Sequence, residues 1–216
     1  MFDTPTEPLQ VVFEDKHLLA LVKPAGLLSV PGRGSGKADC LSARAQQRWP
    51  GACIVHRLDQ ATSGLILLAR GADMQRALSA AFAARRVHKH YEALVHGPAQ
   101  PSNRTGWAEI DLPLLIDWPN RPRSAVNHLA GKPSITRWRP LAYDQSRDVS
   151  RLALQPLTGR SHQLRVHLQA IGHPIVGDAL YGPADGAPRL MLHARGLELA
   201  HPATGQALAL HSEVPF

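Results

Sequence analysis

The stretch His56–Gly64 (HRLDQATSG) runs directly into the apolar segment Leu65–Ala69 (LILLA). A short apolar run that follows a polar turn predicts a buried β-strand. Asp59 then precedes the start of this strand, among Arg, His and hydroxyl side chains. A single Asp in a turn is often only a turn former, because its side chain bonds its own backbone. A carboxylate held in a polar pocket at the start of a buried strand is, in contrast, suited to chemistry.

The composition is that of one globular domain with a basic surface. The chain has 216 residues, of which 44% are hydrophobic, and this is enough for a single sizeable core. Lys and Arg outnumber Asp and Glu 24 to 17, which gives a formal charge of +7 and favours a polyanionic partner. Two cysteines without CxxC spacing, and apolar runs far shorter than the roughly 20 residues of a membrane span, indicate a cytoplasmic protein with no membrane partner.

The apolar patterns along the chain predict both strands and helices. The glycine-rich segment Pro31–Lys37 lacks the spacing of a phosphate-binding loop and is expected to be a flexible surface loop. Residues 98–133 have few apolar runs, and Asp117–Arg123 (DWPNRPR) predicts a stiff basic loop. Residues 1–10 are expected to form an N-terminal arm, and residues 11–216 one domain. Strands are predicted at 11–13, 18–22, 87–95, 135–141 and 152–154, and helices at 38–49, 73–86 and 161–171.

Three ordered motifs resemble the signature segments of the RluA family of pseudouridine synthases. They are His56–Gly64, Lys89–Gly97 (KHYEALVHG) and Thr158–Leu168 (TGRSHQLRVHL), and the KPAG turn at 23–26 also matches. The resemblance extends from about Val11 to Gly205. It implies an α+β fold in a single domain, built on a mixed, mainly antiparallel β-sheet with flanking helices and a basic RNA-binding cleft. Because the resemblance begins at about Val11, we do not expect the separate N-terminal RNA-binding domain that some relatives carry.

The resemblance implies that the protein is an enzyme, an isomerase that converts uridine to pseudouridine in structured RNA. Asp59 is then the catalytic carboxylate, Tyr91 lies over the target uracil, and Arg165 pairs with the carboxylate. A guanidinium partner stabilises a carboxylate ion in a closed pocket. Two roles remain open for Asp59, which acts either as a nucleophile at ribose C1′ or as a base at C2′. No cofactor or metal is expected, since His162 and His167 are five residues apart and do not share one helical face.

A uridine within a helix cannot be reached, so the target nucleotide has to be flipped out of its stack. In relatives the Arg of the HRLD motif enters the space that the base leaves, and the resemblance assigns this role to Arg57. A contact between Arg57 and a phosphate is the alternative. Further substrate contacts are expected from His56, Thr62, His162 and Leu164, and contacts to the RNA backbone from Arg121, Arg123 and Arg160.

The segment Asp117–Pro122 (DWPNRP) resembles the branch of the family that modifies both tRNA and 23S rRNA. This implies two RNA partners, a tRNA anticodon stem-loop with its target at the first loop nucleotide and a 23S rRNA hairpin, with no DNA partner and a monomeric enzyme. A non-catalytic RNA-binding or RNA-folding module is the alternative, but it leaves the joint presence of Asp59, Tyr91 and Arg165 unexplained. A hydrolase that uses the Asp and a nearby His is a second alternative, without support from a GxSxG motif.

Overall fold

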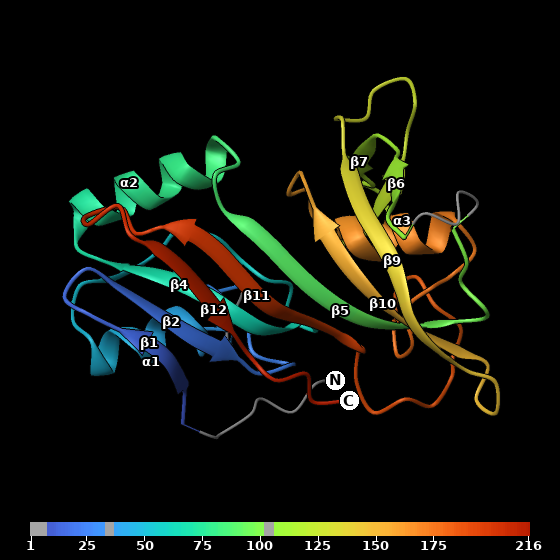
Figure 1. The fold of residues 1–216 in the computed structure, drawn as a ribbon, viewed down its shortest axis with the longest axis horizontal. Helices are drawn as coiled ribbons and strands as arrows, with labels where there is room; N and C mark the ends of the chain where they lie inside the picture. The colour runs from blue at the N-terminus through green and yellow to red at the C-terminus, as the bar shows by residue number, and fades with distance from the viewer. Residues whose placement is uncertain (1–7, 33–36, 102–105) are drawn as a thin grey trace. The chain divides into compact units, whose positions relative to one another are not determined.

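The computed structural model describes residues 8–32, 37–101 and 106–216. Its contacts divide the chain into two compact units (Figure 1). Unit 1 contains the chain up to His88 and the returning segment His193–Pro215, and unit 2 contains Lys89–Leu192 together with Phe216. Within the described ranges, no helix is both long and apolar enough to cross a bilayer.

Unit 1 is a sheet with β4 at its centre. Ala69 pairs with Leu18 of β2 and also with Cys53 of β3, so β2 and β3 lie on opposite edges of β4. β11 runs parallel to β4, and the other strand pairs described in this unit are antiparallel. The elements are β1 (Gln10–Glu14), β2 (Leu18–Lys23), α1 (Leu41–Arg48), β3 (Ala52–Ile54), β4 (Ser63–Arg70), α2 (Ala72–Ala83), β11 (Leu192–Ala200) and β12 (Ala207–His211).

The two faces of β4 are both buried, which explains why its sequence is apolar without alternation. Leu65 and Leu67 pack in one hydrophobic cluster with Leu78 of α2. Ile66 and Leu68 pack in another cluster with residues of α1. Successive side chains of a strand point to opposite faces, so α1 and α2 cover opposite faces of the sheet. The segment that follows the HRLD motif is therefore the core strand of unit 1.

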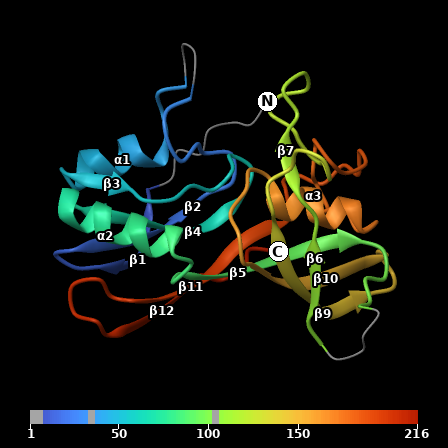
Figure 2. The same cartoon turned by 90° about the horizontal axis from the view of Figure 1, so that it is seen from above.

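Unit 2 is an antiparallel sheet with the strand order β5-β10-β9-β6 and a separate β7–β8 hairpin. The hairpin projects from the sheet of this unit (Figure 2). Leu94, Val149 and Val176 form a hydrophobic cluster in unit 2. The elements are β5 (His88–His96), β6 (Ala108–Asp111), β7 (Leu114–Ile116), β8 (Ser124–Val126), β9 (Ile135–Asp144), β10 (Val149–Pro156) and α3 (Gln163–Ala170).

The predicted fold class, an α+β arrangement on a mixed, mainly antiparallel sheet with flanking helices, is confirmed. All six predicted strands, among them Leu65–Ala69, and all three predicted helices are present, with shifted ends. α1 begins only at Leu41, because the Cys40 side chain caps it by accepting a hydrogen bond from the Ala43 N–H. α2 ends at Ala83 rather than at residue 86, and Arg85 adopts a left-handed conformation with φ +57°.

Two other expectations need correction. No strand is predicted from the sequence in the region 98–133, but this region contains β6, β7 and β8. The predicted arm at 1–10 ends earlier, because Gln10 already belongs to β1. Residues 1–7 of this arm lie outside the described residues, as do residues 33–36 of the glycine-rich loop.

Gly64, the last residue of the HRLDQATSG motif, provides a test of this packing. Its φ is +117°, and an added Cβ would lie 2.3 Å from the Ala194 carbonyl oxygen of the parallel neighbour β11. We expect Gly64→Ala to lower the free energy of unfolding by about 2–4 kcal/mol in urea denaturation, through backbone strain and collision. Gly51→Ala is the control, since Gly51 has φ +85° and no atom near its added Cβ. It should lose only about 1 kcal/mol, and equal losses would contradict the collision at Ala194.

Candidate active site

The backbone on both sides of Asp59 is fixed by hydrogen bonds within unit 1. The Ser29 hydroxyl donates to the Leu58 carbonyl at 2.8 Å and accepts from the Leu58 N–H at 3.1 Å. On the other side, the Gln60 carbonyl accepts from the Gly26 N–H at 2.8 Å, and the Gln60 amide donates to the Gly26 carbonyl at 2.9 Å. Asp59 itself is half-buried. The structure thus holds the backbone that carries Asp59 in one position, as a site for chemistry requires.

Lys23, the first residue of the KPAG turn, is fully buried beside this loop. Its ammonium group donates to the carbonyls of Pro24 at 2.9 Å, Leu27 at 2.8 Å and Gln60 at 3.0 Å. An ammonium has three N–H donors, so the three carbonyl oxygens match the group. A buried charge requires such compensation. The turn after β2 and the loop that carries Asp59 are therefore joined through one cation.

The other motif residues in this loop have different environments. The His56 Nε2 accepts a hydrogen bond from the Leu67 N–H at 2.8 Å, and its ring stacks on Phe82 with centroids 4.4 Å apart. Arg57 is exposed, whereas Thr62 is buried and its N–H donates to the Asp59 carbonyl at 3.1 Å. His56 thus has a structural partner, and Arg57 is accessible to an RNA. Their contacts with substrate stay predictions.

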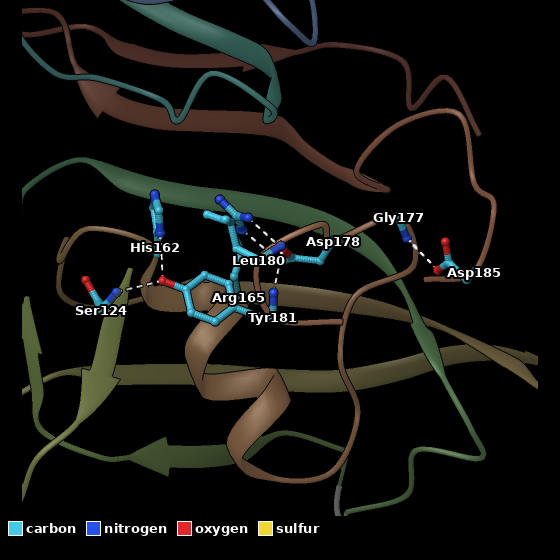
Figure 3. A network of polar contacts seen from close by, with 8 residues as sticks. All are labelled: Ser124, His162, Arg165, Gly177, Asp178, Leu180, Tyr181 and Asp185. Carbon is cyan, nitrogen blue, oxygen red and sulfur yellow. Dashed lines mark hydrogen bonds and ion pairs between the residues drawn. The ribbon is translucent and has the colours of Figure 1, made fainter. Parts of the chain in front are cut away.

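Arg165 lies on α3 in unit 2 and forms a buried, two-pronged ion pair with Asp178 (Figure 3). Its Nε and Nη2 donate to the two carboxylate oxygens at 2.7 and 2.6 Å, and both side chains are almost completely buried. Asp178 also accepts from the backbone N–H groups of Leu180 and Tyr181 at 3.0 and 3.1 Å. Two parallel hydrogen bonds fix a planar guanidinium in orientation as well as in position.

Tyr181 connects this ion pair to His162. The Tyr181 ring lies 5.0 Å from the Arg165 guanidinium carbon, and its hydroxyl accepts from the Ser124 N–H of β8 at 2.7 Å. The same hydroxyl shares a 2.7 Å hydrogen bond with His162 Nδ1 (Figure 3). His162 has φ +56° and immediately precedes α3. The helix start, the β8 strand and the Asp178 turn are thereby held as one network.

The other predicted site residues of unit 2 lie on different elements and differ in burial. Tyr91 is half-buried in β5, opposite Leu154 of β10. Leu164 is buried on α3, and the exposed Arg160 directs its guanidinium to the Pro133 carbonyl at 3.3 Å. Arg121 and Arg123 are both exposed on the loop between β7 and β8. Asp59 belongs to unit 1, whereas Tyr91 and Arg165 belong to unit 2, so their joint action stays a prediction.

Two titratable groups of unit 2 show how their surroundings set protonation. Burial lowers the pKa of His167, which is enclosed between Thr136 and the Leu112 carbonyl, each 3.0 Å from a ring nitrogen. A carbonyl only accepts, so Nε2 carries the proton and the neutral ring is part of the core. Burial acts to raise the pKa of Asp185, but hydrogen bonds from Gly177, Ala187 and His96 hold it below its ordinary value. The predicted reaction assigns no role to either group.

Sequence reasoning missed the role of Lys23, which holds the Asp59 loop, and that of Asp178, which holds the Arg165 side chain. The sequence places Lys23 only in a turn, because lysine is usually exposed and the pattern LLALVK does not by itself show that this one is buried. Asp178 was assigned to a supporting tail segment, without a partner. Its partner, Arg165, is 13 residues away in the sequence, and no local periodicity connects the two.

The comparisons with known proteins find RNA pseudouridine synthases. The family model for RNA pseudouridylate synthases matches residues 17–170. The dual-specificity RNA pseudouridine synthase RluA of Escherichia coli K12 is 42% identical, with 100% of this chain and 98% of the relative covered. The protein of the same description from Vibrio cholerae is 46% identical, with 93% and 81% covered. The solved structure of human RNA pseudouridylate synthase domain containing 1 matches with a TM-score of 0.81 at 31% identity, covering 100% of this chain and 87% of that one.

Replacing the Lys23 ammonium tests its role in holding the Asp59 loop. Lys23→Met keeps an unbranched side chain but leaves three carbonyl oxygens without this donor. We expect the free energy of unfolding to fall by about 2–5 kcal/mol, together with faster hydrogen exchange at the Gly26 amide, which bonds the Gln60 carbonyl. Lys16→Met is the matched control, because Lys16 is exposed. A Lys23 variant as stable as this control would exclude the anchoring role.

Removing one charge from the buried ion pair tests the network in unit 2. Asp178→Asn keeps the shape of the side chain but replaces the carboxylate that binds Arg165 Nε and Nη2 with a neutral amide. Breaking a buried pair in this way costs about 3–5 kcal/mol, which thermal and urea unfolding would measure. Asp185→Asn provides the comparison, since Asp185 is more exposed and bonds mainly backbone N–H groups. An Asp178 variant that loses no more than the Asp185 variant would contradict a stabilising role of the pair.

Proposed function

The chain belongs to the RluA family of RNA pseudouridine synthases, and we propose that it modifies two RNAs, a tRNA anticodon stem-loop and a 23S rRNA hairpin. The reaction itself, isomerisation of uridine to pseudouridine in RNA, follows from the family. The choice of RNAs rests on the dual specificity named for the relatives and on the DWPNRP segment. We place the enzyme in the cytoplasm and expect it to act as a monomer.

We assign the bond changes to Asp59. The bond between ribose C1′ and uracil N1 breaks, the uracil turns, a bond from C1′ to C5 forms, and the C5 proton leaves while N1 becomes protonated. These steps balance without an oxidant or reductant, so the isomerisation requires no redox cofactor. The Asp59 carboxylate assists cleavage either by attack at C1′ or by taking a proton from C2′. The anchored backbone on both sides of Asp59 is the observation that carries this assignment.

We assign the supporting roles to Tyr91 and Arg165. Tyr91 would stack on the detached uracil and accept the C5 proton, directly or through water. Arg165 would stabilise the ionised Asp59, and its firm attachment to Asp178 supports a role that needs a fixed guanidinium. Arg57, which is exposed, would fill the space that the flipped nucleotide leaves or bind a phosphate.

A non-catalytic RNA-binding module remains the alternative to catalysis by this chain. It would bind the same RNAs but would leave the C5 hydrogen in place. A hydrolase would instead release free uracil. Both alternatives are therefore separated from isomerisation by the product that is formed.

Replacing Asp59 is the direct test. We expect Asp59→Asn to lower tritium release from C5-labelled uridine by at least roughly 10³-fold in both stem-loop RNAs, because it removes the reactive oxyanion. RNA binding should persist, since the amide has almost the same surface. Asp73→Asn serves as a control, because Asp73 is exposed and paired only at the surface with Arg76. Full activity in the Asp59 variant would disprove the assignment, and release from only one RNA would restrict the proposal to that substrate.

A further inference from the structure

Trp118 lies in the loop that joins β7 to β8 and exposes 61% of its surface. Trp49 and Trp138 expose only 5% and 6%, as is usual for so large an apolar side chain. The neighbouring residues Leu115 and Ile116 also expose more than a third of their surface. The tip of this hairpin therefore presents an aromatic ring to solvent, where the ring adds little to the stability of the fold.

The loop holds this ring in a defined position. The Asp117 N–H donates to the Arg123 carbonyl at 2.9 Å and closes the loop. Inside it, the Asn120 N–H donates to the Asp117 carbonyl at 3.2 Å, and the Asn120 amide donates to the Asp117 carboxylate at 2.9 Å. Pro119 and Pro122 further restrict the backbone. A flat ligand would meet an ordered ring, and little conformational entropy would be lost on binding.

One face of the Trp118 ring is already covered. The Arg121 guanidinium carbon lies 3.7 Å from the ring centroid, which is a close cation–π contact. With Arg121 on one face and 61% of the side chain exposed, the opposite face is open to solvent. Arg121 was expected to contact the RNA backbone. That contact stays a prediction. The structure adds that Arg121 supports the ring, while Arg123 supplies the second cation of the loop.

We propose that the open face of Trp118 is a stacking site for an unpaired base of the RNA, other than the uridine that is isomerised. The two arginines favour a polyanion, and they disfavour a second copy of a chain whose net charge is +7. An exposed ring does not exclude water, so it is unsuited to the bond changes themselves. This inference rests on the proposed function in one respect, namely that the ligand is a stem-loop RNA.

The site would let the enzyme distinguish loops from stems. In a double helix each base is stacked between its neighbours, and only an unpaired base has a free face. A ring that stacks on one base gains affinity for a hairpin loop and none for a duplex. Since every base has an aromatic face, Trp118 would select unpaired structure rather than a particular sequence.

Binding of Trp118→Ala to two synthetic RNAs, a stem-loop and a fully paired duplex with the same stem, tests the proposal. At one fixed salt concentration, the stem-loop should bind roughly 5- to 150-fold more weakly, and the duplex less than about twofold, as for the loss of one base stack. Trp118→Phe should restore most of the affinity. Leu129→Ala is the control, because Leu129 is a fully exposed apolar residue in the segment that follows β8. It should leave both affinities unchanged.

Fluorescence gives a second readout that a structural defect would not imitate. The stem-loop should quench the tryptophan emission of the wild type, and Trp118→Phe should abolish most of this quenching while retaining the fold. Equal losses for stem-loop and duplex in Trp118→Ala would overturn the proposal in favour of a backbone contact. A concentration-dependent dimer that disappears in Trp118→Ala, with RNA binding intact, would overturn it in favour of a second copy. Selective loss of stem-loop binding with no tritium release by the wild type would support the stacking site and refute the catalytic proposal.

Discussion

The buried ammonium of Lys23 is the interaction on which the Asp59 loop depends. It gathers the carbonyls of Pro24, Leu27 and Gln60, and the last of these is 37 residues away in the sequence. Without the cation these carbonyl oxygens would lose a donor in the interior, and each one left unpaired would cost about 1–3 kcal/mol, although the Gln60 carbonyl would keep its bond from the Gly26 N–H. The turn after β2 and the loop before β4 therefore form one unit of structure. The backbone position of Asp59 depends on this electrostatic requirement as well as on the hydrogen bonds that Ser29 and Gly26 make with its neighbours.

Unit 2 meets the same requirement with different chemistry. Arg165 is buried more deeply than charged side chains usually are, and it pairs with a carboxylate, that of Asp178. A lysine behaves as a point charge and collects oxygens from several directions, whereas the arginine fork matches one carboxylate in one plane. The first arrangement fixes backbone segments, and the second fixes the orientation of a side chain. In both units the cost of burying a charge is what holds the predicted functional group in place.

The sequence predicted those parts of the fold whose apolar residues form a strong local pattern. β4 was visible because it is buried on both faces, and α2 because its apolar stripe faces the core. β6, β7 and β8 were missed because each has only three or four residues with mixed exposure, so their pairing partners rather than their own pattern define them. The end of α2 was missed because alanine and arginine both favour helix. Asp59 was found through its motif, but what Lys23 and Asp178 face is a property of the tertiary structure.

Trp118 is exposed and Asp59 is half-buried, because recognition of an RNA and a change of bonds place different requirements on a side chain. A carboxylate that changes bonds gains from a fixed position in a pocket that can exclude water. A group that recognises an RNA loop has to be reachable before any base is flipped, so it lies in solvent at the tip of a hairpin. The ordered loop around Trp118 offers no benefit to the core, and its ring gains free energy only when something flat covers it. A hairpin tip that is ordered, cationic and aromatic is therefore best explained by what it binds, and an unpaired base satisfies all three of its properties.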